Sequence, residues 1–236
     1  MLDERLSLAA ALYEPCGLGA DIGADHALLP CHLLEQGVCE RMILTDLSPK
    51  ALSRAGAEVR RRGLENRVSL RCGDGLSVLR EKCGCISVTG MGGRTIAAML
   101  TEGRERLLGA VLVICAHTEQ AETRLCLRDI GYRIVREEPC VCAGHAYVIW
   151  RAEPGREAPY TPEEAQCGRL LFRSGSPMLH PYAEIRLSAL ERRLAGLRAA
   201  AEPDKAAVAE TLGLIRYYRE RLPEIRSARP TDGGKP

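Results

Sequence analysis

The chain has few aromatic residues and no long apolar run. Phe, Trp and Tyr make up 4% of its 236 residues, with one Phe and one Trp. A broad aromatic platform for stacking successive bases of a nucleic acid is therefore not expected. No stretch of about 18 apolar residues occurs, which argues against a membrane-spanning helix. The start "MLDERLSLAAALYEP" lacks the pattern of a signal peptide, so we expect a protein of the cytoplasm.

The sequence also lacks a metal-binding motif and a strong charge of either sign. Its 11 cysteines include two C-x-C pairs, Cys83–Cys85 and Cys140–Cys142, but no C-x-x-C pair and no neighbouring histidine cluster. We therefore expect buried free thiols and no metal. The net charge of +2 does not by itself predict a nucleic-acid partner.

What the sequence does contain is a regular alternation of strand and helix patterns. Such alternation predicts an α/β fold, a parallel sheet with helices on both faces. The last two strands are separated by "PCVCAGH" without a helix, so they predict a hairpin whose final strand is antiparallel, at or near the edge. The predicted strands cover residues 17–23, 41–46, 67–73, 85–90, 110–116, 132–138 and 146–152. The predicted helices lie near residues 27–38, 49–62, 75–82, 93–107 and 119–130.

The last third of the chain has a different pattern. Residues 153–164, "EPGREAPYTPEE", indicate a linker because they are rich in proline and charge. Leucines at 187, 190, 194 and 197 repeat at coiled-coil spacing, and a matching apolar stripe runs from Val208 to Leu222. The two stripes predict an antiparallel helical hairpin, with a seam that closes on itself or packs on the first domain. We expect a cofactor-binding domain at 1–153, this helical coiled-coil domain at 154–226 and a disordered tail at 227–236.

The strand ends indicate which nucleotide cofactor fits. Asp46 ends the second strand 23 residues after Gly23. This is close to the spacing at which an acid binds a ribose diol, of NAD or S-adenosylmethionine alike. A dinucleotide fold needs G-x-G-x-x-G, whereas the stretch "DIGADHALLP" (21–30) keeps one glycine and adds Asp25. That acid would repel a diphosphate but is tolerated beside the sulfonium and ammonium of S-adenosylmethionine. The pattern therefore favours a class I methyltransferase over a dehydrogenase.

Two further strand ends carry candidate cofactor residues. Asp74, in "GDGL" (73–76), is placed to accept a hydrogen bond from an adenine amino group. The alternative is a plain turn residue, because Asp-Gly is a common turn dipeptide. The fourth strand ends in "TGMGG" (89–93).

These stretches and the helical hairpin resemble the bacterial tRNA (adenine-N1)-methyltransferases that modify position 22 of tRNA. The resemblance runs from "LDERLSLAAAL" to the second hairpin helix, with Ala24 in place of the usual Ser or Thr. It implies a Rossmann-like domain with a mostly parallel seven-stranded sheet, S-adenosyl-L-methionine as cofactor, and a coiled-coil domain that helps to hold tRNA. With the strand-end positions, it assigns the following residues to the cofactor: Asp21, Gly23, His26, Asp46, Leu47, Asp74, Gly75, Gly90, Met91 and Gly92.

The substrate side contains one departure from the family. Where members often read Q-P-N after the fifth strand, this chain has Cys115, Ala116 and His117. The change concerns contacts to the target base, for which we take Gly93, Arg94 and His117 as candidates. Phosphate contacts are expected from arginines, although each is also explained as ordinary surface. The candidates are Arg94, Arg169, Arg173, Arg186, Arg192 and Arg193.

Asp25 is the candidate catalytic residue. Methylation at N1 gives the adenine a positive charge, which a nearby carboxylate would stabilise. The alternative is that Asp25 only caps the helix that follows. His26 also has two alternative roles: it hydrogen-bonds either the methionine carboxylate of the cofactor or only the local backbone. The function that the resemblance implies is methylation of N1 of an adenine, at position 22 of tRNA, by a monomer without membrane or metal partners. Alternatives are a methyltransferase acting on another RNA, a protein or a small molecule, and a non-catalytic cofactor-binding protein that interacts with RNA.

Overall fold

The computed structural model describes residues 2–227, with a seven-stranded sheet at its centre. The strand order is β3-β2-β1-β4-β5-β7-β6, and β7 runs antiparallel to both of its neighbours. All other neighbouring pairs are parallel. This confirms the predicted sheet and hairpin, with β6 at the edge and β7 beside it. The strands are β1 (Cys16–Ile22), β2 (Cys39–Asp46), β3 (Val68–Cys72), β4 (Cys85–Met91), β5 (Val111–Ala116), β6 (Tyr132–Cys142) and β7 (His145–Pro154).

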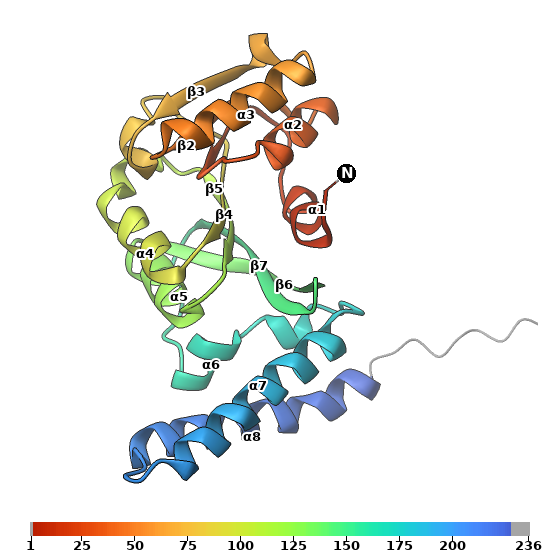
Figure 1. The fold of residues 1–236 in the computed structure, drawn as a ribbon, viewed down its shortest axis with the longest axis vertical. Helices are drawn as coiled ribbons and strands as arrows, with labels where there is room; N and C mark the ends of the chain where they lie inside the picture. Colours follow the sequence, from red (N-terminus) through yellow and green to blue (C-terminus); the bar gives the residue numbers. More distant parts are fainter. Residues whose placement is uncertain (1, 228–236) are drawn as a thin grey trace, which may run out of the picture.

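Helices cover both faces of this sheet (Figure 1). Helices α4 and α5 lie together on one face, and α1, α2 and α3 lie on the other. The first group is α4 (Gly93–Glu102) and α5 (Gln120–Asp129); the second is α1 (Glu4–Ala11), α2 (Leu28–Glu35) and α3 (Pro49–Arg61). The connection to the C-terminal part contains the short α6 (Pro162–Cys167), followed by α7 (Leu179–Ala199) and α8 (Lys205–Ser227).

Alternating apolar residues on the central strands fill both interfaces. On β5, Leu112 and Ile114 belong to the cluster beneath α4 and α5, whereas Val113 and Cys115 belong to the cluster beneath α1 and α2. All four are 0% exposed. Side chains of a strand point alternately to opposite faces, so a strand covered on both sides is apolar throughout.

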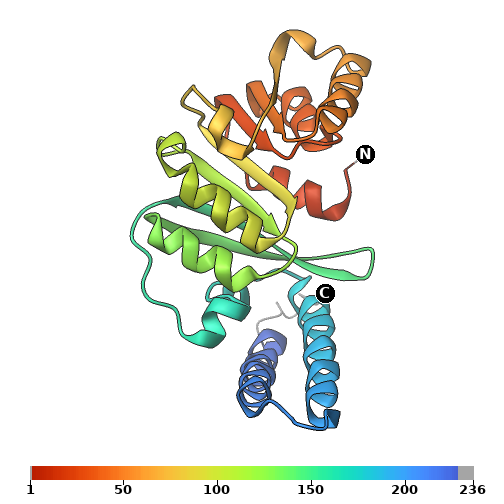
Figure 2. The same ribbon diagram turned by 60° about the vertical axis from the view of Figure 1, so that its left-hand side comes forward.

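The C-terminal helices form the predicted hairpin, whose long axes lie side by side in both views (Figures 1 and 2). Leu190 of α7 and Ile215 and Tyr218 of α8 are buried. They belong to the same hydrophobic cluster as Trp150 of β7. The seam therefore closes on itself, and the hairpin also packs on the sheet domain.

A buried ion pair joins the two parts. Arg124 of α5 and Glu137 of β6 have side chains 0% and 2% exposed, and Arg124 Nε lies 2.8 Å from Glu137 Oε1. Arg124 Nη1 also donates to the carbonyl of Ala165 in α6. The other carboxylate oxygen of Glu137 accepts from the backbone N–H groups of Leu170 and Leu171, at 2.7 and 2.9 Å. The pair thus fixes the segment that leads into the hairpin.

Two predicted segments differ from the structure, and a third lies almost wholly outside the described residues. Instead of a helix near 75–82 there is a single 3-10 turn, Gly75–Val78, because Arg71 Nη1 donates to the carbonyl of Val78 and to Glu81. The helix near 93–107 ends at Glu102, and a separate 3-10 turn, Arg104–Arg106, follows it. The tail predicted at 227–236 lies outside the described residues, apart from Ser227, which ends α8.

Within residues 2–227, no helix is long and apolar enough to cross a membrane. The same part of the chain contains no group of three or more His, Cys, Asp or Glu side chains that could hold a metal ion. All 11 cysteines are free. Eight of them are buried: Cys31, Cys39, Cys83, Cys85, Cys115, Cys126, Cys140 and Cys167.

Candidate active site

The loops that follow four parallel strands meet at one edge of the sheet. The backbone N–H of Gly23, after β1, donates to the carbonyl of Thr45 in β2 at 2.8 Å. The N–H of His117, after β5, donates to the carbonyl of Met91 in β4 at 2.9 Å. Gly23 has a φ of 78°, and a Cβ there would lie 2.3 Å from Met91 Cε. Only glycine permits both this left-handed backbone and this close approach of the β1 and β4 loops.

Gly93 joins the end of β4 to the loop that follows β5. Its N–H donates to the carbonyl of Thr118 at 3.0 Å. A Cβ on Gly93 would lie 2.3 Å from the carbonyl oxygen of Glu119, which is backbone and has no freedom to rotate away. The start of α4 therefore rests directly on the loop between β5 and α5. Gly93, predicted from sequence as a substrate residue, thus makes a packing contact here, and a Cβ on Gly92 would lie 3.0 Å from Thr118 Oγ1.

The acids at the ends of β2 and β3 are free to accept from a ligand. Asp46 Oδ1 accepts from the N–H of Ser48 at 2.8 Å, and no other hydrogen bond to its carboxylate occurs within residues 2–227. Asp74 is exposed and makes no side-chain cap bond to the 3-10 turn at Gly75. Asp74 is also a turn residue, as the alternative has it, because its backbone carbonyl accepts from the N–H of Ser77 at 2.9 Å. Beside them Leu47 is 70% exposed, an apolar surface suited to cover an adenine ring.

Asp25 does not cap α2. The residue at the N-cap is Ala27, in a left-handed conformation with φ 50°, and it makes no side-chain cap bond. The Asp25 carboxylate instead accepts from Arg54 Nε of α3 at 2.6 Å and lies 3.6 Å from His26 Nε2. The capping alternative is thus wrong, and the carboxylate is held at the mouth of the β1 loop by a cation.

Asp21 is buried beneath this loop. Its carboxylate accepts a hydrogen bond from the Ser87 hydroxyl, which in turn accepts from the Tyr13 hydroxyl at 2.7 Å. Burial raises the pKa of Asp21 to about 7, although the Ser87 hydrogen bond and the charge of Arg5 act to lower it. Asp21 is therefore partly protonated near neutral pH until a cation lies close to it.

This pKa predicts a pH dependence of stability. The pKa in the folded chain lies above the ordinary 3.8, so between about pH 4 and pH 7 the folded protein binds more protons than the unfolded one. The free energy of unfolding contributed by Asp21 should therefore fall as the pH rises through this window. Denaturant titrations of the cofactor-free protein and of Asp21→Asn, from pH 4 to 8, would measure it. Identical slopes in both proteins would contradict the prediction.

Comparisons with known proteins show the family of the chain. A family model described as a methyltransferase domain matches residues 2–150. The tRNA (adenine(22)-N(1))-methyltransferase of Bacillus subtilis is 30% identical over 173 residues, which cover 72% of this chain and 73% of the relative. The chain belongs to this methyltransferase family.

Solved structures agree with the assignment to the family. Streptococcus pneumoniae Sp1610 in complex with S-adenosyl-L-methionine is 27% identical, with a TM-score of 0.82 over 94% of this chain and 100% of that one. The Bacillus subtilis M1A22 tRNA methyltransferase TrmK, at 23% identity, shares the fold with a TM-score of 0.82 over 94% of this chain and 99% of its own.

The residues of this methyltransferase fit S-adenosyl-L-methionine as its cofactor. Asp46 offers a carboxylate for a ribose diol, and Leu47 and Asp74 offer an apolar face and an acceptor for adenine. Asp21, at the end of β1, suits the ammonium of the methionine part. Gly75, Gly90 and Met91 border the same loops. We keep these assignments, with Gly23 and Gly92, as proposals.

The arginines predicted to contact phosphates fall into two groups, those that already form ion pairs or are buried and those that are exposed and unpaired. Arg94 pairs with Glu122, Arg169 with Glu157 and Glu164, and Arg193 with Glu210. Arg186 does not face solvent as predicted, because its Nε is buried beside Tyr182 and Tyr218. Arg173 and Arg192 are exposed and form no ion pair with residues 2–222, the part of the chain whose side chains are described.

Several residues at the site carry no local sequence signal. Tyr147 of β7 places its ring 5.3 Å from that of His117, and His145 lies 6.4 Å from Tyr147, between ring centroids. Arg5 of α1 lies 5.8 Å from the Tyr147 ring. They come together because β7 is antiparallel, so its first residues lie at the edge where the parallel strands end. One tyrosine ring and two histidine rings thus lie together beside the end of β5.

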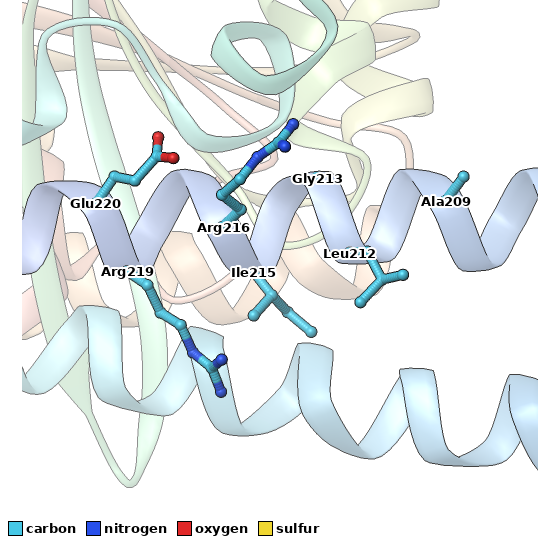
Figure 3. A pocket seen from close by; sticks show the side chains of 7 residues that line it. All are labelled: Ala209, Leu212, Gly213, Ile215, Arg216, Arg219 and Glu220. Carbon is cyan, nitrogen blue, oxygen red and sulfur yellow. The ribbon is translucent and has the colours of Figure 1, made fainter.

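A large groove lies away from this edge. It has a volume of about 650 Å³ and runs along α8, where Figure 3 shows Arg216 and Glu220 on one side of the helix. Leu212, Ile215 and Arg219 point toward the neighbouring helix in the same view. Its position on the hairpin separates it from the strand-end chemistry.

Proposed function

We propose that this protein transfers the methyl group of S-adenosyl-L-methionine to N1 of the adenine at position 22 of tRNA. The observation that carries the proposal is that the loops after β1 to β5 share one edge of the sheet, with Asp21 at the end of β1, Asp46 at the end of β2 and Asp74 after β3. Three acids and no glycine-rich diphosphate cradle suit a cofactor that is cationic and lacks phosphate. We infer that the enzyme acts in the cytoplasm and as a monomer.

Positioning supplies much of the catalysis in this proposal. The bound cofactor supplies an electrophilic methyl group on a sulfonium. Adenine N1 has an in-plane lone pair and needs no strong base before it attacks. The Gly92–Gly93 turn and Met91 form a wall that sets the approach of the base, and close approach in line contributes to the rate. Asp25 stabilises the positive charge that the base acquires, or accepts a proton from its amino group.

His117 and Tyr147 provide a face for the target base. Burial, and after it the charge of Arg5, lower the pKa of the His117 imidazole, so it stays neutral at physiological pH. A neutral ring does not repel the methylated, positively charged adenine. An adenine in folded tRNA must leave its stack to reach this face. The two rings lie beside the turn at Met91, to which His117 is hydrogen-bonded.

A labelling experiment tests the reaction. The protein is incubated with labelled S-adenosylmethionine and unmodified tRNA, and the RNA is digested to nucleosides. N1-methyladenosine is the expected product. Label on a protein or a small molecule instead would support another methyltransferase, and cofactor binding without any transfer would support a non-catalytic RNA-interaction protein.

We predict that tRNA binding weakens with salt. Contacts to phosphates by arginines such as Arg173, Arg192 and Arg216 release counterions, so affinity should fall more than about tenfold between about 50 and 200 mM salt. Filter binding or fluorescence anisotropy would measure it, with cofactor affinity as the control that changes much less. An affinity for tRNA that is insensitive to salt would contradict phosphate recognition by these arginines.

A further inference from the structure

Arg5 carries a polar group that the chain leaves unpaired. Its side chain is 17% exposed, and its nearest acid is Asp3, with Nη2 3.6 Å from Asp3 Oδ2. Its Nη1 is buried and has no hydrogen-bond partner within residues 2–227. A buried guanidinium nitrogen without an acceptor destabilises the fold, so such a group in a native chain points to a ligand that satisfies it.

The guanidinium lies among the strand ends of the site. Its charge acts on Asp21 at the end of β1 and on Cys115 and His117 at the end of β5, where it shifts the pKa of each. Its Cζ lies 5.8 Å from the ring of Tyr147 at the start of β7. Arg5 therefore sits on the same side of the loop edge as Asp21, away from Asp46 and Asp74 on the β2 and β3 side.

We propose that Arg5 binds the carboxylate of the methionine part of S-adenosyl-L-methionine. The methionine end of this cofactor is zwitterionic, with one ammonium and one carboxylate. Asp21 and Arg5 present the opposite pair of charges. A guanidinium binds a carboxylate through two parallel N–H groups, which matches the free Nη1. The competing candidate, His26, is 68% exposed and lies beside Asp25.

This inference rests on the cofactor of the proposed function and not on its RNA target. It can be tested with S-adenosyl-L-methionine and its decarboxylated analogue, which keeps the sulfonium and the ammonium but lacks the carboxylate. Calorimetric titration gives the dissociation constant of each for the native protein, Arg5→Met, Arg5→Gln and the matched control Arg41→Met, an exposed arginine on β2. Thermal unfolding without ligand reports whether each variant folds.

The native protein and Arg41→Met should prefer S-adenosyl-L-methionine by about 10- to 100-fold, the range of a charge-assisted contact. In Arg5→Met and Arg5→Gln the preference should fall to within about threefold, through weaker binding of the carboxylated ligand alone. If Arg5→Met does not fold, the ligand preference of Arg5→Gln decides the test. An unchanged preference, an equal loss of both ligands, or no preference in the native protein would overturn the assignment of Arg5. Binding of neither ligand by the native protein would overturn the cofactor itself.

Discussion

Replacing Glu137 with alanine should lower the free energy of unfolding by about 3–5 kcal/mol, the range for breaking a buried ion pair. The substitution leaves the Arg124 guanidinium buried without its carboxylate. It also removes the acceptor for the N–H groups of Leu170 and Leu171. Denaturant unfolding, followed by circular dichroism, measures the change.

An exposed ion pair on the hairpin provides the control. Glu191→Ala breaks the ion pair with Arg219 on the hairpin surface, where the two side chains are 45% and 63% exposed, and should change stability far less. The double variant Arg124→Met with Glu137→Leu removes both charges and should recover much of the loss. If Glu137→Ala were as stable as Glu191→Ala, the Arg124–Glu137 pair would not fix the segment that leads from the sheet into the hairpin.

Replacing Asp25 with alanine should lower kcat by about 100-fold, the scale of one group that stabilises charge or moves a proton in a transition state. Cofactor affinity should change by less than about threefold, because this carboxylate is assigned to the target base. Stability should fall by less than about 1 kcal/mol, since its side chain is 40% exposed and caps no helix. Single-turnover rates with tRNA, beside calorimetric cofactor binding, separate these effects.

Arg54→Met is the matched control for that change. It removes the partner of Asp25 but keeps the carboxylate, so it should retain more activity than Asp25→Ala. Asp25→Asn keeps the shape but not the charge, and should resemble Asp25→Ala. If turnover in Asp25→Ala survived within a few-fold, while stability alone dropped, the catalytic role of Asp25 would be wrong.

The order of elements and the strand-end acids were predictable from the sequence. Loops after parallel strands share one edge of a sheet, so Asp21, Asp46 and Asp74 lie along the same edge whatever the details of packing. The helix pattern of the hairpin was equally local, because its leucines repeat along one face of each helix. These features depend on periodicity and chain order, which a sequence contains directly.

The rest of the site depends on contacts between distant segments. Arg5 and Tyr147 reach it from α1 and β7, 142 positions apart (147 − 5), and neither belongs to a motif. The Asp25 cap was wrong because Ala27 adopts a left-handed conformation that delays the start of α2. The prediction of a helix near 75–82 was wrong because Arg71 donates to the carbonyl of Val78, which a helix would have used for its own hydrogen bond. Tertiary contacts overrode local preference in each case.

The most direct test of the reaction maps the methyl group on RNA. The native protein and S-adenosylmethionine are incubated with one tRNA transcript that has adenine at position 22, and with the same transcript carrying guanine there. Mass spectrometry of the nuclease fragments then locates any methylated nucleotide. Our account predicts N1-methyladenosine at position 22 of the first transcript and no methylation of the second. Equal methylation of both transcripts, or methylation of neither, would contradict it.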